Sequence, residues 1–172
     1  MTKGPDTAAL QEAIDKLAIG ELQSRYMYAL DWRDPDLFAS LFTENAILEW
    51  AEGKAKGRDE IRAASAQMRA FYSKLAEGSA PKKPPRLRHF VTNRVFEING
   101  DHARSWAYWL DLNNDNVQRW PYVAGYGYYV DDLVRTAGGW RFARRQVTNE
   151  ITGESSLDNP IASQTQIPED AA

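Results

Sequence analysis

Residues 26–50 read YMYALDWRDPDLFASLFTENAILEW, and this stretch is the most informative for the fold because its structure must change twice within it. Pro35 disfavours helical geometry at Asp34, so a helix that enters the stretch cannot pass through it. Asp34 is then placed as an N-cap, with Pro35 at the first position of a short helix, Pro35–Phe42. The apolar run Ala46–Trp50 predicts a short strand.

Helices are predicted on both sides of this stretch. Apolar residues recur at three- and four-residue steps over Thr7–Leu30, which predicts one long helix that ends around Asp31–Arg33. Downstream, a turn through Gly53 and Gly57 leads to a third helix, about Arg58–Leu75, with the same periodicity. The chain therefore begins with three helices and has one short strand among them.

The second half of the chain predicts an antiparallel sheet. Residues 78–85 (GSAPKKPP) are too rich in glycine and proline for regular structure and indicate a loop. Asn99-Gly100 is the strongest hairpin signal in the chain, and Ala137–Gly139 marks the last hairpin. The predicted strands are Arg88–Ile98, Asp101–Leu112, about Arg119–Arg135 and Trp140–Thr152.

Helices that are segregated from an antiparallel sheet indicate an α+β architecture. We expect residues 1–152 to form a single domain, in which the sheet curves around the helices and leaves a conical cavity. Residues 153–172 are polar and contain few core residues. They predict a tail that is either disordered or laid over another surface, for example as a flap over the cavity.

The composition excludes several function classes. A net charge of −3 provides no overall field that would attract nucleic acid. The sequence has neither the histidine and carboxylate spacing of a metal site nor a glycine-rich phosphate loop or dinucleotide fingerprint, so we expect no metal and no cofactor. A signal peptide pattern and an apolar run of membrane-spanning length are also missing, and we expect a cytoplasmic protein.

Acid–base chemistry around histidine has few options here, because the chain has no cysteine and two histidines. His102 directly follows the Asn99-Gly100 turn, and we expect it to be exposed. His89 stands at the start of a predicted strand, and Asp31 at the end of the first helix. A carboxylate that orients an imidazole is a general-base unit. The alternative for Asp31 is an ion pair with Arg33 or Arg58.

The stretch at 26–50, with RHFVTN at residues 88–93 and GGWRFARR at residues 138–145, resembles the SnoaL-like branch of the nuclear transport factor 2-like fold. Its most specific part is D-x-x-D-P-D-x-F-x-x-L-F, and the resemblance covers about residues 8–152. It implies three N-terminal helices packed in a strongly curved, mainly antiparallel sheet that forms a cone-shaped barrel with an internal cavity. Scytalone dehydratase and hexachlorocyclohexane dehydrochlorinase are the most similar enzymes, and the resemblance gives Asp31 and His89 the role of their Asp–His pair.

The chain departs from that pattern at several positions. Ala107 stands where scytalone dehydratase-like sites have a second histidine. The serine and asparagine of the next strand match Gly127 and Tyr129, and a tyrosine of the early strand matches Trp50. Arg145 matches an arginine of the dehydrochlorinase-like site, although it could equally pair with a buried acid for structural reasons.

We therefore predict His89 as the general base, Asp31 as its orienting partner, and Tyr129 and Arg145 as donors to a developing negative charge. Strand alternation places Tyr126 and Tyr129 on opposite faces, and the sequence leaves open which of the two faces the cavity. The predicted substrate contacts are Tyr26, Tyr28, Trp50, Tyr108, Tyr126 and Asn93.

The functional expectation is a cofactor-independent lyase, either a dehydratase or a retro-aldol-type carbon–carbon lyase, that acts on a hydroxylated aromatic or polycyclic small molecule. An isomerase or cyclase would use the same base. A non-catalytic ligand-binding protein and a small subunit of a ring-hydroxylating dioxygenase-like complex are the alternatives without chemistry. By analogy with the family, we expect a homodimer or homotrimer, with no nucleic acid or membrane partner.

Overall fold

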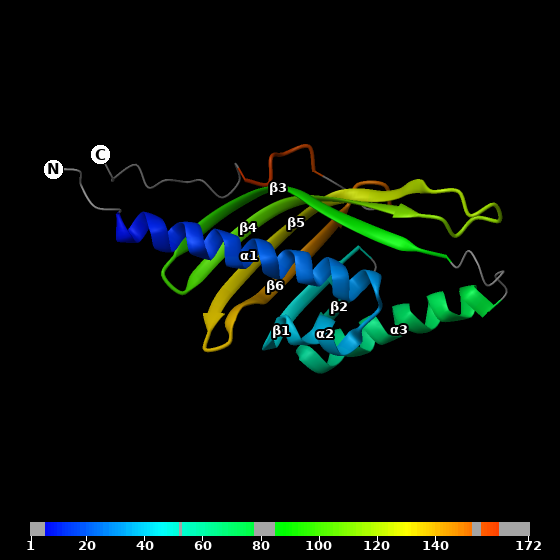
Figure 1. Cartoon of the computed structure of the whole chain (residues 1–172), viewed down its shortest axis with the longest axis horizontal. Coiled ribbons are helices and arrows are strands. Elements are labelled where there is room, and N and C mark those ends of the chain that lie inside the picture. Colours follow the sequence, from blue (N-terminus) through cyan, green and yellow to red (C-terminus); the bar gives the residue numbers. More distant parts are fainter. Residues whose placement is uncertain (1–5, 52, 78–84, 153–155, 162–172) are drawn as a thin grey trace.

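The computed structural model describes residues 6–51, 53–77, 85–152 and 156–161. Three helices precede or interrupt a six-stranded sheet, which confirms the α+β class (Figure 1). The elements are α1 (Thr7–Asp31), α2 (Pro35–Ser40), β1 (Phe42–Trp50), β2 (Gly53–Lys56), α3 (Arg58–Glu77), β3 (Leu87–Asn99), β4 (His102–Asn113), β5 (Tyr122–Thr136) and β6 (Gly139–Asn149).

The junction between α1 and α2 follows the local signals in the sequence. The Asp34 side chain accepts a hydrogen bond from the backbone N–H of Leu37 at 3.0 Å, and Pro35 opens α2. However, α2 ends at Ser40, before the predicted Phe42. Phe42 already pairs with Phe142 of β6, so tertiary pairing converts the predicted end of the helix into the start of β1.

The sheet has the strand order β2-β1-β6-β5-β4-β3, and its neighbours are antiparallel except for β1 and β6, which are parallel. The predicted turn between Gly53 and Gly57 is instead the short strand β2, which pairs with β1. Register shifts interrupt the pairings of β3 with β4, β4 with β5, and β5 with β6. Such bulges bend strands and increase their twist, and here the sheet curves but stays open between β2 and β3.

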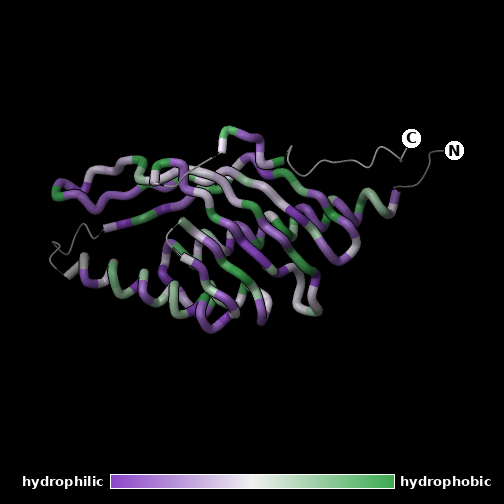
Figure 2. The backbone as a smooth tube through the Cα atoms, turned by 180° about the vertical axis from the view of Figure 1, so that it is seen from behind, coloured by the Kyte–Doolittle hydropathy of each residue, from purple (hydrophilic) through white to green (hydrophobic). Residues whose placement is uncertain are grey.

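Helix α1 lies across the concave face of this sheet (Figure 1). It buries Ile19, Leu22 and Tyr26 in a core that includes Phe142 and Leu133 of the sheet. Alternation along β5 places Tyr129, Asp131 and Leu133 on the buried side. The tube in Figure 2 shows the alternation of hydrophilic and hydrophobic residues along the strands from the opposite side.

Some predictions fall on residues outside the described ranges. Most of the predicted loop, residues 78–84, and most of the tail, residues 153–155 and 162–172, are among them. The proposed closure of the cavity by the tail therefore stays a prediction. Within the described ranges, the helices are too short or too polar for any of them to span a membrane.

Candidate active site

Asp31 and His89 are in direct contact. The Nδ1 atom of His89 lies 2.7 Å from Oδ1 of Asp31, and the side chains are 11% and 5% exposed. The backbone N–H of His89 also donates to both carboxylate oxygens, at 3.1 and 3.0 Å. The carboxylate thus joins the last residue of α1 to the start of β3. A carboxylate at Nδ1 favours the tautomer that carries its proton there, which leaves Nε2 free to accept a proton.

His89 lines a cavity of about 530 Å³ between α1, α3 and the sheet, a size that suits a small-molecule ligand. Asp31 is not among the lining residues and lies behind the imidazole. Apolar and aromatic side chains dominate the lining, which consists of Tyr26, Leu30, Phe38, Leu48, Trp50, Ala64, Ser65, Gln67, Met68, Phe71, His89, Trp109, Tyr129 and Val147. Tyr26, Trp50 and Tyr129, predicted from the sequence, are therefore brought together with His89.

Two tyrosines form one side of the cavity. The rings of Tyr26 and Tyr129 meet edge to face at 6.1 Å. Burial raises the pKa of both phenols above the ordinary value, most strongly for Tyr129. Both are thus O–H donors at neutral pH. Among the described residues, none forms a hydrogen bond with the Tyr129 hydroxyl, which leaves it available to a ligand oxygen.

Arg145 lies beneath these tyrosines and outside the cavity lining. It forms two hydrogen bonds of 2.7 Å with Asp131, and both side chains are fully buried. Its guanidinium carbon lies 4.1 Å from the centre of the Tyr26 ring and 4.2 Å from that of Tyr129. Burial opposes the charge of Arg145, but the charge and hydrogen bonds of Asp131 hold its pKa above the ordinary value.

Arg145 thus forms the ion pair with a buried acid that the structural alternative predicts. Gln23 Nε2 and Ser105 Oγ complete the cluster by donating to Asp131 Oδ2 at 3.2 and 3.1 Å. Arg145 is not among the described residues that line the cavity. It supports the two tyrosine rings from the protein interior.

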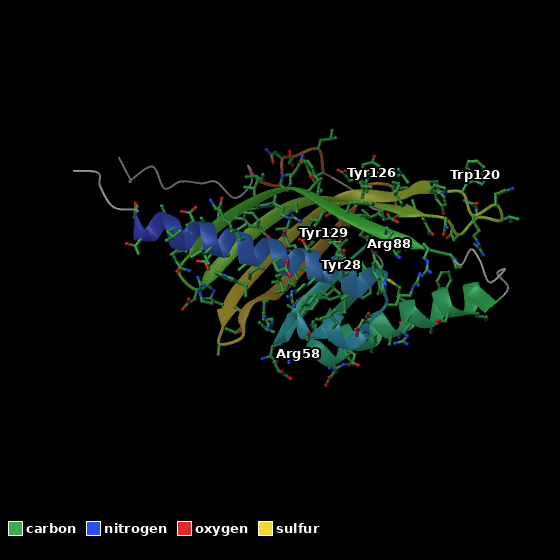
Figure 3. All side chains as sticks on the ribbon, in the orientation of Figure 1. Tyr28, Arg58, Arg88, Trp120, Tyr126 and Tyr129 are labelled. Carbon is green, nitrogen blue, oxygen red and sulfur yellow. The ribbon has the colours of Figure 1, made fainter. Side chains whose placement is uncertain are left out.

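Four predicted substrate contacts lie outside the cavity lining. Tyr28 is on the exposed side of α1, where it stacks on Trp32. Tyr108 and Tyr126 are exposed on the outer face of the sheet, because they alternate with the inward-facing residues of β4 and β5. Figure 3 shows Tyr126 on the side of the sheet away from α1, and Tyr129 behind that helix. Asn93 is exposed at the β3 bulge, with a φ of 50°.

Other lining residues were not predicted from the sequence. Trp109 packs against Tyr129 at 5.9 Å and anchors its indole N–H on the carbonyl oxygen of Thr148 at 3.1 Å. Strand alternation from Ala107 could have placed it on the inner face. Ser65 and Met68 of α3 form the opposite wall, and no sequence signal pointed to them, because a helix pattern does not specify which cavity the helix borders.

The described residues contain no group of three or more histidine, aspartate or glutamate side chains that could hold a metal ion. Among the described lining residues, the titratable groups are His89, Tyr26 and Tyr129. The arrangement can remove a proton at His89 Nε2 and donate hydrogen bonds from phenols.

Several solved structures are similar to this chain in fold. A nuclear transport factor 2-like protein from Novosphingobium aromaticivorans has a TM-score of 0.72 at 22% identity, covering 89% of this chain and 94% of that protein. A candidate scytalone dehydratase from the same organism has a TM-score of 0.67 at 23% identity, covering 87% and 95%. A point variant of Rv3472 from Mycobacterium tuberculosis, a protein of unknown function, has a TM-score of 0.70 at 24% identity, covering 87% and 78%.

Among curated protein sequences, none matches this chain. Residues 11–146 match the sequence profile of the SnoaL-like domain. This range covers α1 from its second turn, α2, α3, strands β1 to β5 and most of β6. It includes Asp31 and His89. The chain belongs to the SnoaL-like domain family.

Proposed function

We propose that this protein is a cofactor-independent lyase in which His89 is the general base. The observation that carries the proposal is the 2.7 Å contact between His89 Nδ1 and Asp31 Oδ1, with the imidazole at the cavity and the carboxylate behind it. A base must be held in one tautomer and must reach the ligand. The Asp31 contact supports the first condition, and the position of His89 at the cavity supports the second.

In the proposed reaction, neutral His89 takes a proton from a carbon or hydroxyl of the substrate at Nε2. The electron pair left behind forms the new double bond or carbonyl as the leaving group departs. Asp31 keeps the Nδ1 proton in place and stabilises the imidazolium that forms. Tyr129 donates its O–H to the oxygen on which negative charge develops. The imidazolium then returns its proton to the leaving group, so the enzyme ends in its starting state.

The substrate we propose is an uncharged, hydroxylated aromatic or polycyclic molecule. The described residues that line the cavity include aromatic rings from several elements, such as Trp50, Trp109 and Phe71, and no lysine, arginine or carboxylate. Flat apolar ligands suit such walls, whereas a ligand carboxylate or phosphate would find no cation among these lining residues. Loss of water is the first choice, supported by the fold similarity to a candidate scytalone dehydratase. Retro-aldol cleavage, isomerisation and cyclisation use the same base.

The outer face of the sheet supports homo-oligomer formation as a separate proposal. Phe90, Tyr108 and Tyr126 lie on three neighbouring strands and are exposed. The same surface would suit the alternative of a dioxygenase-like small subunit. That alternative does not require a buried Asp–His contact, and the contact therefore favours catalysis. Light scattering would distinguish a monomer from a dimer or trimer.

The test of the function uses His89→Gln and Asp31→Asn on a panel of hydroxylated aromatic alcohols and diols. Asparagine at position 31 can still accept the backbone N–H of His89, so the fold is retained while the orienting charge is lost. We expect turnover to fall by a factor of about 10²–10⁴ in each variant, the range typical of general-base loss. The matched control is His102→Gln, which changes an exposed histidine on β4. Full turnover in both dyad variants would refute the lyase, and unchanged ligand affinity with no turnover in any form would support a binding protein.

A further inference from the structure

A second acidic residue, Asp111, stands opposite His89 on the neighbouring strand. In the pairing of β3 with β4, His89 stands directly opposite Asp111. Side chains of directly opposed residues lie on the same face, with Cβ atoms about 5 Å apart. Asp111 and Trp109 are two residues apart on β4, so their side chains lie on the same face of the sheet. Because Trp109 lines the cavity, the Asp111 side chain is also on the concave face.

The structure leaves space for this carboxylate at a glycine. Gly125 of β5 is the partner of Asp111 on its other side. A Cβ atom at Gly125 would lie 2.5 Å from Asp111 Oδ1 and 3.1 Å from the Trp109 ring. Because glycine has no side chain, the Asp111 and Trp109 side chains can lie over the β5 backbone at Gly125. A register shift directly after Asp111 adds local bending at this point.

Asp111 is buried without an ion pair. Its residue is 7% exposed, and among the described residues none forms a salt bridge with its side chain. Burial raises the pKa of its carboxyl, the nearby charge of Asp31 raises it further, and His89 lowers it. Partial burial of a carboxylate without an ion pair disfavours its charged form. Such a group becomes favourable when a positive charge forms beside it, and the residue that can gain one is His89.

We propose that Asp111 is a positioning residue that acts through His89, by stabilising the imidazolium formed when His89 accepts a proton. His89 would then be flanked by Asp31 from α1 and Asp111 from β4, with Trp109 packed against its ring at 6.2 Å. The proposal rests on the proposed function only in giving His89 the role of base. The electrostatic interaction between Asp111 and His89 requires no substrate.

The first test is an NMR titration of the two histidine rings in the unliganded protein. A negative neighbour favours imidazolium, so Asp111→Asn should move the titration midpoint of His89 to lower pH by about one unit or more. His102 is the internal reference and should not move. The matched control is Asp132→Asn on β5, whose carboxylate pairs with Arg104 and is remote in register from His89. A His89 midpoint that is equal in wild type and Asp111→Asn would overturn the proposal.

A second measurement covers the case in which Asp111→Asn does not fold. In the unmodified protein, the carboxyl ¹³C resonance of Asp111 should change over the same pH interval as the His89 ring, because the two charges are coupled. Independent titration of the two groups would overturn the proposal. In an active preparation, Asp111→Asn should also displace the acidic limb of the kcat/KM profile to lower pH. If the protein proved not to be a lyase, the kcat/KM profile could not be measured, but both NMR titrations would still test the interaction between Asp111 and His89.

Discussion

Replacement of Arg145 by methionine removes the cation of a fully buried ion pair and leaves the Asp131 carboxylate without its partner. Both side chains have an exposed fraction of 0%. The breaking of such a pair from one side destabilises a protein by about 3–5 kcal/mol. Gln23 and Ser105 still donate to Asp131, which places the expected loss at the lower end, about 3 kcal/mol. That is a large share of the roughly 5–15 kcal/mol typical of a folded domain.

Urea denaturation followed by tryptophan fluorescence measures this loss. With a urea m-value of about 2 kcal/mol per molar, the midpoint should fall by about 1.5 M. The double variant Arg145→Met with Asp131→Leu should recover most of the stability, because an apolar pair of similar volume replaces the ionic one. A midpoint for Arg145→Met within about 0.3 M of wild type, coupled to a loss of turnover, would refute the structural role and restore Arg145 as a direct donor.

Two further predictions concern a phenol and a carboxylate. Tyr129→Phe should reduce kcat by about 10²–10³, because Tyr129 lines the cavity and can donate its O–H. Tyr126→Phe is the control and should leave kcat unchanged, because Tyr126 is exposed on the outer face. Equal kcat values for the two variants in a steady-state assay would argue against phenol donation. Hydrogen bonds from Arg135 lower the pKa of Asp15 to about 2, so the stability that this carboxylate contributes is present above pH 3.8 and is lost as pH falls through about 2. Thermal unfolding should therefore show that Asp15→Asn is less stable than wild type at pH 7, and the difference in stability should shrink towards about pH 2. A difference in stability that does not depend on pH would contradict this linkage.

Local rules predicted the elements well where the determining groups are close in sequence. The Asp34-Pro35 pair ends one helix and caps the next through a contact within four residues. The β3–β4 hairpin forms at the predicted Asn99-Gly100 signal. Asn99 pairs with His102, so Gly100 is the first central residue of the turn, and its φ of 61° suits glycine at that position. In contrast, α2 ended earlier than predicted because the partner of Phe42 is on β6, and periodicity carries no information about that distant strand.

The position of Arg145 shows why the site itself was harder to predict. Near the last hairpin, Leu133 pairs with Phe142, and a regular register would place Arg144 opposite Asp131. The register shifts by one residue between Leu133 and Asp132, so Arg145 takes that place. A one-residue shift exchanges the two faces of a strand. The sequence does not reveal the bulge, and so it could not distinguish a cavity donor from a buried ion pair.

The charges around the cavity limit how the proposed reaction can proceed. Arg145 is neutralised by Asp131, so the interior beneath the tyrosines contributes little net positive field. The carboxylates of Asp31 and Asp111 instead favour positive charge on His89. Negative charge on a substrate oxygen must then be stabilised by neutral donors, and Tyr129 is suited to this because burial keeps its phenol protonated. A substrate that already carried a negative charge would be repelled by the same carboxylates that assist the base. The electrostatics therefore favour a neutral substrate and an oxyanion that forms only transiently.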